Sequence, residues 1–180
     1  YIARDTHRNT TWQQARFECC HHKWCDLSET DGGVAILNDG KYGVGFLENQ
    51  ISLSLLRSPI RPDVTADMGH HSFCYRIVPH AGGPVQAGIN RRALQFNQPP
   101  IKSDVAYSGT DFAPLYLQAM KFSEDGKRIV VRLSEQDGRR GTLRLPRKVQ
   151  VLNMLEDVER ETDFVDYTPF EILTLGWPVE

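Results

Sequence analysis

The sequence predicts an all-β fold, an antiparallel β-sandwich of about ten strands with one short helix. Short apolar or alternating runs dominate its 180 residues, and turn-forming residues separate them. Long stretches with a 3.6-residue period are almost missing, which disfavours a helical protein. A chain of this length allows one domain or two small ones, and we expect a single domain over residues 1–180.

The predicted strands are short apolar or alternating runs, each ended by turn chemistry. In chain order they are Ala15–Cys20, Gly33–Leu37, Val44–Leu47, Ile51–Leu56, Phe73–Val78, Leu115–Met120, Ile129–Leu133, Gly141–Leu145, Val149–Leu152 and Phe170–Leu175. Glu48-Asn49-Gln50 predicts a hairpin between two of these runs. Asp125-Gly126 predicts a second hairpin, because glycine adopts the positive φ that a tight turn needs.

One helix is expected before the middle of the chain. Val85, Ile89, Ala93 and Phe96 recur at spacings of three and four, which gives an apolar face for packing on a sheet, and Pro99-Pro100 closes the segment. Residues 97–113 are rich in Pro, Ser, Asp and Gly and predict the longest loop, one that crosses between sheets.

Composition excludes several classes of partner. The 21 Lys and Arg nearly balance the 23 Asp and Glu, for a net charge of −2, so we expect no nucleic-acid binding. No run of about 18 apolar residues is present, so we expect no membrane span. Cys19 and Cys20 are adjacent, and the four cysteines show no disulfide spacing, which favours a reducing compartment.

The octet ECCHHKWC, residues 18–25, raises the question of a metal site. If Ala15–Cys25 is a strand, side-chain alternation splits the cluster: Cys20 and His22 point to one face, and Cys19, His21 and Lys23 point to the other. A structural zinc site needs four ligands, usually as two spaced pairs, and no second pair follows. A contribution from His70, His71 or Cys74 stays open. Small thiols packed in strands are the favoured interpretation, and we expect no metal site.

Polar residues gather at two predicted strand ends. One group is a glycine-flanked turn, and the other is a loop before the fifth predicted strand. Their candidate members are Asn38, Asp39, Lys41 and Tyr42 in the turn and Arg57, Asp63, Asp67 and His71 in the loop. Directional donors and acceptors on a rigid sheet suit recognition of sugar hydroxyls. Ordinary turn chemistry explains the same residues equally well.

These residues also carry a family resemblance, which runs over nearly the whole chain. The sequence resembles the C-terminal part of glycoside hydrolase family 38, the α-mannosidases, in the branch of cytosolic and bacterial enzymes. The matching stretches, in order, are Thr6-His7-Arg8-Asn9-Thr10, Ala15-Arg16-Phe17-Glu18, His22-Lys23-Trp24, Asp26-Leu27-Ser28, Leu37 to Gly43, Leu53 to Pro59, Pro62-Asp63, Ala66-Asp67, Gly69-His70-His71, Ser123 to Gly126 and Pro169 to Ile172. The family pattern has Pro where Asp5 stands, Cys where Gly40 stands, and Glu-Phe-Thr-Tyr where Ser72-Phe73-Cys74-Tyr75 stands.

The resemblance implies a non-catalytic domain of a longer, cytoplasmic enzyme. Family members hold zinc, or another divalent metal, and the Asp nucleophile in an N-terminal catalytic domain, and this chain lacks those motifs. We therefore expect no catalytic residue and no cofactor here, and no hydrolysis by the fragment alone.

The resemblance also implies the partners. They are the N-terminal catalytic domain of the same chain and a mannose-containing oligosaccharide, while a homo-oligomer stays open. The loop from Arg57 to His71 is the candidate for approaching the sugar pocket, and Arg57 and Asp67 are its leading residues. Contacts with the catalytic domain alone would explain the same residues. A free-standing carbohydrate-binding sandwich is the alternative function.

Overall fold

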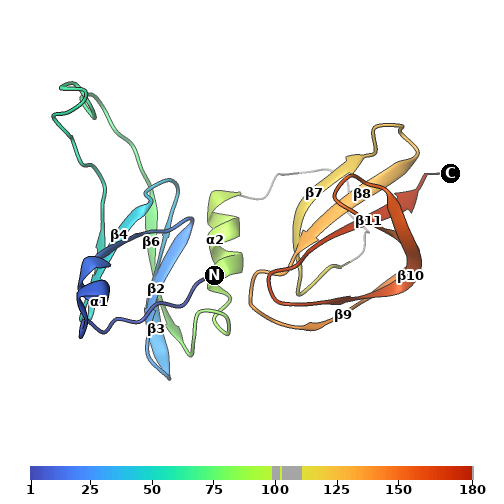
Figure 1. Cartoon of the computed structure of the whole chain (residues 1–180), viewed down its shortest axis with the longest axis horizontal. Coiled ribbons are helices and arrows are strands. Elements are labelled where there is room, and N and C mark those ends of the chain that lie inside the picture. Colours follow the sequence, from blue (N-terminus) through green and yellow to red (C-terminus); the bar gives the residue numbers. More distant parts are fainter. Residues whose placement is uncertain (99–101, 103–110, 180) are drawn as a thin grey trace. The chain divides into compact units, whose positions relative to one another are not determined.

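A computed structural model describes residues 1–98, 102 and 111–179 (Figure 1). These ranges contain eleven strands and two helices, and every strand pairing is antiparallel. The all-β, antiparallel sandwich prediction is therefore confirmed. The chain divides into two compact units, Ile2–Lys102 and Ser103–Glu180, with Tyr1 in the second. A single domain over residues 1–180 stays a prediction, since compactness does not show whether the units unfold together.

The unit Ile2–Lys102 contains two three-stranded sheets and both helices. Its elements are α1 (Thr11–Ala15), β1 (Glu18–Cys20), β2 (Trp24–Ser28), β3 (Gly32–Asn38), β4 (Gly43–Leu47), β5 (Gln50–Leu53), β6 (Tyr75–Ala81) and α2 (Ile89–Asn97). The sheets have the orders β1-β4-β5 and β2-β3-β6. In Figure 1, β4 lies on one side of the β2-β3-β6 sheet and α2 on the other.

Ile89, Ala93 and Phe96 of the predicted helix face pack as expected, whereas Val85 lies before α2 begins. Ile89 and Ala93 of α2 are fully buried against Leu37 of β3 and Val78 of β6. Trp24 packs against the same cluster. Fully burying a side chain such as Leu37 or Ile89 stabilises the fold by about 1.5–3 kcal/mol, so this face holds α2 on its sheet.

A buried ion pair lies beneath α2, on the β2-β3-β6 sheet. His80 Nε2 lies 2.6 Å from Asp26 Oδ2, and His80 Nδ1 lies 3.0 Å from the carbonyl oxygen of Gly82. Both side chains are almost completely buried. The carbonyl oxygen of Gly82 can only accept, so His80 Nδ1 is the donor in that hydrogen bond. The buried Asp26 carboxyl is hydrogen-bonded at both oxygens, because Ser28 Oγ donates to Oδ1.

The unit Ser103–Glu180 is built on one five-stranded sheet, which Figure 1 shows curling round its own core. The strands are β7 (Tyr116–Phe122), β8 (Arg128–Ser134), β9 (Gly141–Leu152), β10 (Val158–Tyr167) and β11 (Ile172–Pro178), in the order β10-β9-β11-β8-β7. Alternate residues of β8, β9 and β11 point inward, and Leu133 and Leu175 are fully buried. The unit thus has a core of its own.

Several element predictions are wrong in informative ways. The run Ala15–Cys25 is not one strand: α1 ends at Ala15, and β1 and β2 belong to different sheets on either side of Lys23, whose φ is +63°. A Thr10–Gln13 capping box starts α1, and this signal was present in the sequence. The predicted strands Gly141–Leu145 and Val149–Leu152 are one strand, β9, whose register on β10 shifts around Pro146.

Two strands, β2 and β10, lack a sequence prediction altogether. Only two of the ten residues of β10 are buried, so its apolar alternation is too weak to recognise. The hairpins at Glu48-Asn49 and at Asp125-Gly126 are confirmed, and Gly126 has a φ of +70°. The predicted loop 97–113 lies largely outside the described residues.

Glu135 joins two loops of the second unit through its carboxylate. Oε1 accepts the N–H of Asp137 at 2.8 Å, and Oε2 accepts those of Gly138 and Phe170 at 2.9 Å. Burial raises the pKa of Glu135, but the N–H donors of Phe170, Arg139, Asp137 and Gly138 outweigh it, so the pKa lies below its ordinary value. The charged form therefore stabilises this unit.

We expect Glu135→Gln to remove part of the acid sensitivity of the protein. With a lowered folded-state pKa, the contribution is complete above the unfolded value of about 4.3 and is lost as pH falls through the folded one. The variant should lose about 1–3 kcal/mol at pH 7, and its stability deficit should shrink towards pH 3. Urea unfolding of both proteins from pH 7 to pH 3 measures the difference; a deficit that stays constant with pH would contradict the assignment.

Candidate functional site

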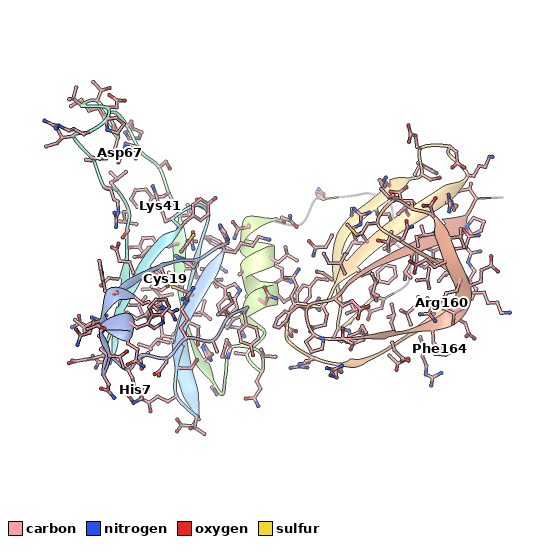
Figure 2. All side chains as sticks on the ribbon, in the orientation of Figure 1. His7, Cys19, Lys41, Asp67, Arg160 and Phe164 are labelled. Atoms are coloured by element: carbon pink, nitrogen blue, oxygen red, sulfur yellow. The ribbon has the colours of Figure 1, made fainter. Side chains whose placement is uncertain are left out.

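The candidate site is centred on the loop of residues 54–74, which connects β5 to β6. Figure 2 shows this loop projecting from the sheets of its unit, with Asp67 near its far end. Every residue from Leu56 to Ser72 is exposed except Ala66, which is half-buried. The loop has no core of its own, so backbone and side-chain hydrogen bonds must hold its shape.

The carboxylate of Asp67 closes the loop. Asp67 Oδ2 accepts the N–H of Ser58 at 2.8 Å and that of Arg57 at 3.3 Å, nine and ten residues away in the chain. His71 Nε2 donates to the carbonyl oxygen of Asp67 at 2.8 Å. The N–H groups of Ser58 and Arg57 hold the pKa of Asp67 below its ordinary value. Near neutral pH the closing group is thus a carboxylate.

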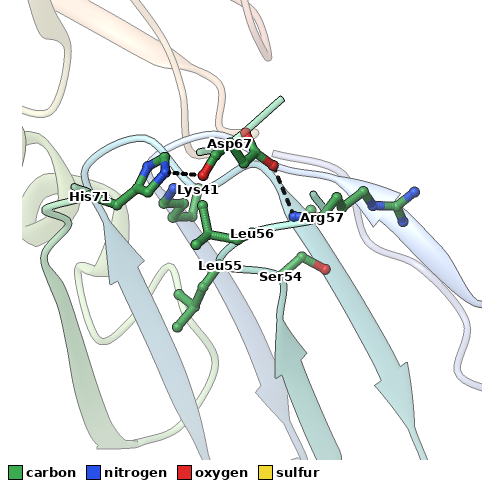
Figure 3. Close-up of a pocket in the computed structure, with 8 residues that line it drawn as sticks. Lys41, Ser54, Leu55, Leu56, Arg57, Asp67 and His71 are labelled. Carbon is green, nitrogen blue, oxygen red and sulfur yellow. Dashed lines mark hydrogen bonds between the residues drawn. The ribbon is translucent and has the colours of Figure 1, made fainter. Parts of the chain in front are cut away.

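Arg57 connects the loop to the body of its unit. Its guanidinium Nη2 forms an ion pair with Glu18 Oε2 of β1. Figure 3 shows the Arg57 side chain extending away from Asp67. The hydrogen bond between these two residues comes from the backbone N–H of Arg57. Because both ends of the pair are solvent-accessible, its contribution to stability is small, about 0–1 kcal/mol.

A cavity of about 240 Å³ is lined by residues of this loop and of the neighbouring segment 41–43. It is smaller than the pockets of about 300–1,000 Å³ that enclose whole ligands. Four of its lining residues come from the predicted site, and Figure 3 shows them beside an apolar pair from the loop. The lining comprises Lys41, Gly43, Ser54, Leu55, Leu56, Arg57, Asp67 and His71. The structure thus brings together Lys41, Arg57, Asp67 and His71.

Asn38 organises the turn that follows β3. It is fully buried, and its Oδ1 accepts the N–H groups of Gly40 and Lys41 at 3.1 and 2.8 Å. Asn38 Nδ2 donates to His21 Nε2 at 2.8 Å, while His21 Nδ1 donates to the carbonyl oxygen of Tyr42 at 3.1 Å. Burial lowers the pKa of His21, which agrees with a neutral ring that donates once and accepts once. The side-chain oxygen and nitrogen of Asn38 therefore both form hydrogen bonds within the protein.

The remaining predicted residues are held by local contacts. Asp63 Oδ1 accepts the N–H and the hydroxyl of Thr65, which lowers the pKa of Asp63 and forms a turn. Asp39 Oδ2 accepts the N–H of Cys74 at 2.9 Å. The exposed Tyr42 ring packs edge-to-face on His22. Asp63 does not line the cavity, nor do Asn38, Asp39 and Tyr42.

Sequence reasoning missed two partners of the site. Glu18 pairs with Arg57, and His21 connects Asn38 to Tyr42. The pairing of β1 with β4 brings both residues close to the site, and no sequence signal predicted that pairing.

Gly40, which departs from the family pattern, has open space where a Cβ would lie, so a larger residue fits that position without a clash.

Within the ranges 1–98, 102 and 111–179, no group of three or more His, Cys, Asp and Glu side chains is arranged to hold a metal ion. No described helix has the length and hydropathy to cross a membrane.

Family profiles match both units of the chain. The profile described as "Glycosyl hydrolases family 38 C-terminal domain" matches residues 1–65. A second, "Glycosyl hydrolases family 38 C-terminal beta sandwich domain", matches residues 114–175. A crystal structure of a protein in the glycosyl hydrolase family 38 from Enterococcus faecalis is similar to 89% of this chain and 22% of its own, with a TM-score of 0.68 at 18% identity. That likeness concerns the fold.

Curated relatives extend the match across the chain. "Alpha-mannosidase G" of Dictyostelium discoideum is 37% identical over 97% of this chain and 18% of its own length. "Alpha-mannosidase 2C1" of Homo sapiens is 40% identical over 77% of this chain and 14% of its own, and "Alpha-mannosidase" of Saccharomyces cerevisiae is 57% identical over 52% and 9%. This chain therefore spans less than a fifth of the length of these relatives. The chain belongs to glycosyl hydrolase family 38 and corresponds to the C-terminal domains of that family.

Proposed function

We propose that this chain is the non-catalytic C-terminal part of an enzyme that hydrolyses α-D-mannosides, and that its 54–74 loop completes the sugar pocket of a catalytic domain in the same protein. The observation that carries the proposal is the match of both units to family 38 C-terminal profiles, together with relatives named α-mannosidases. The substrate is then a mannose-containing oligosaccharide. Zinc or another divalent metal belongs, in this proposal, to the catalytic domain.

The state of the carboxylates in the loop supports a non-catalytic role. Retaining hydrolysis needs one carboxylic acid with a raised pKa as proton donor and a second, free carboxylate as nucleophile. Asp63 and Asp67 both have lowered pKa values, and each accepts two hydrogen bonds from its own loop. Neither carboxyl group is suited to protonate a leaving group near neutral pH. Both instead accept hydrogen bonds that hold the shape of the loop.

The cations near the cavity support a positioning role. Lys41 Nζ lies 4.9 Å from the centre of the Phe73 ring, and the guanidinium of Arg57 forms an ion pair with the exposed carboxylate of Glu18. Such groups donate hydrogen bonds to hydroxyl oxygens.

A cytoplasmic location for the parent is part of the proposal, supported by four free cysteines.

The activity itself separates this proposal from a free-standing sugar-binding module. The full-length protein should hydrolyse an aryl α-mannoside, and the chain 1–180 alone should not. Titration calorimetry of the chain alone with mannose should give no binding at millimolar concentration. Sugar binding by the isolated chain, together with no hydrolysis by the full-length protein, would favour the module instead.

The role of Arg57 in substrate contact calls for a paired measurement. In the full-length enzyme, Arg57→Ala should lower kcat/KM for α-mannosides about tenfold or more, because a misplaced or missing donor in a sugar site costs transition-state stabilisation. Thermal unfolding should change little, since the variant loses one exposed ion pair.

Glu18→Gln is the matched control for this variant. It removes the charge that pairs with Arg57 but keeps the guanidinium. If Arg57 contacts sugar, Glu18→Gln should retain most activity. An equal loss in both variants would assign the effect to the ion pair, and unchanged activity in Arg57→Ala would show that the loop contacts only protein.

A further inference from the structure

His21 follows β1 directly, and its ring contacts the turn that carries Lys41. His21 Nδ1 lies 3.1 Å from the carbonyl oxygen of Tyr42, and the same oxygen accepts the backbone N–H of His21 at 2.8 Å. His21 Nε2 lies 2.8 Å from Asn38 Nδ2. One imidazole ring therefore joins residue 38 to residue 42, the two ends of the turn.

These contacts fix the protonation state of the ring. A carbonyl oxygen can only accept a hydrogen bond, so Nδ1 of His21 carries a proton. Asn38 Oδ1 accepts the backbone N–H groups of Gly40 and Lys41, which leaves the amide nitrogen of Asn38 facing His21. Because an amide nitrogen can only donate, Nε2 of His21 accepts and carries no proton. The closed turn thus requires a neutral His21.

A second proton on His21 is incompatible with this arrangement. It would place an N–H donor on Nε2 opposite the N–H donors of Asn38, and two donors form no hydrogen bond. Rotating the Asn38 amide by half a turn would satisfy His21, but it would point Nδ2 at the N–H groups of Gly40 and Lys41. Either way the turn loses hydrogen bonds, and Asn38 is fully buried, so the loss destabilises the closed form.

The surroundings of the ring act mainly in the same direction. Burial lowers the pKa of His21, the carbonyl of Tyr42 raises it, and the charge of His22 lowers it, so that the pKa lies below its ordinary value. From α2, the neighbouring group is an amide, Asn97 Nδ2, which donates to the carbonyl oxygen of Asn38 at 3.0 Å. The other ionisable residues of the segments around the ring are Cys20, Lys23, Asp39, Lys41, Tyr42, Cys74 and Tyr75.

The turn positions a residue of the candidate site. Lys41 lines the cavity together with Arg57, Asp67 and His71. Its backbone N–H is one of the two that Asn38 holds, so opening the turn releases the backbone from which the ammonium group extends. A donor that loses its fixed position contributes less to transition-state stabilisation.

We propose that neutral His21 is a positioning residue for mannoside hydrolysis: it holds Asn38, Asn38 holds the turn that presents Lys41, and protonation of His21 opens the turn and lowers activity. This rests on the proposed function, which supplies the reaction. The opening itself is a property of the turn and does not depend on that function.

The direction of the pH effect follows from the lowered pKa of His21 in the folded protein. An unfolded histidine has a pKa of about 6.5. The contribution of the neutral ring is therefore complete above about pH 6.5 and is lost as pH falls through the folded-state pKa of His21. The turn should be closed at pH 7.5 and should open in acid.

PH profiles of the full-length protein test the role of His21. His21→Gln offers an acceptor, Oε1, in place of Nε2 and does not titrate. Between pH 7.5 and pH 5.0, kcat/KM for an aryl α-mannoside should fall at least threefold more in the wild type than in this variant. His22→Gln is the matched control, because it removes the neighbouring histidine and leaves the His21–Asn38 contact in place; it should fall at least as steeply as the wild type. Equal falls in the wild type and His21→Gln, or the same retention in both variants, would overturn the proposal.

Hydrogen exchange reads the turn without using activity. The N–H groups of Gly40 and Lys41 should exchange more slowly than an unprotected peptide at pH 7.5 in the full-length protein, because Asn38 Oδ1 accepts both. With intrinsic exchange rates corrected for pH, this protection should fall at least threefold at pH 5.0 in the wild type and persist in His21→Gln, while the amides of β3 stay unchanged. Constant protection in the wild type would overturn the proposal, whether or not the variant folds. A turn that opens in acid in a protein that hydrolyses no mannoside would refute the proposed function and leave the opening intact.

Discussion

The carboxylate of Asp67 is the constraint on which the candidate site depends. The 54–74 loop buries almost nothing, so no hydrophobic core fixes its shape. Two hydrogen bonds to one oxygen of Asp67, from Ser58 and Arg57, join the outgoing and returning arms of the loop, and His71 adds a third through the Asp67 carbonyl. Charge-assisted bonds of this kind are about twice as strong as neutral ones, and the lowered pKa of Asp67 keeps the carboxylate charged.

The rest of the unit gives this closure a fixed base. β5 and β6 belong to different sheets, and the loop runs from one sheet to the other. The buried Asp26–His80 pair and the packing of α2 hold the β2-β3-β6 sheet, while Asn38 fixes the turn that presents Lys41. A rigid base with an exposed, closed loop is the usual arrangement for a segment that meets a partner.

The sequence predicted the fold class because apolar alternation and turn residues depend on local chemistry, which a single chain displays. The same reasoning failed where tertiary pairing decides the structure. Half of the residues of β10 are charged, and the segment is a strand because β9 pairs with it. β2 contains a buried aspartate, Asp26, whose hydrogen-bond partner His80 lies 54 residues further along the chain. Among the candidate site residues, Lys41, Arg57, Asp67 and His71 come together as a group. Asn38 and Asp63 are occupied by their own turns, and no spacing rule distinguishes such residues from binding residues.

Hydrogen exchange of two backbone amides tests the central claim most directly. The N–H groups of Arg57 and Ser58 lie in an exposed loop, and their acceptor is the Asp67 carboxylate. If that carboxylate closes the loop, both amides should exchange at least tenfold more slowly than an unprotected peptide, and Asp67→Ala should abolish this protection while leaving the amides of β3 unchanged. Unprotected exchange at Arg57 and Ser58 in the wild-type chain would show that the loop is open, and the account of the site would be wrong.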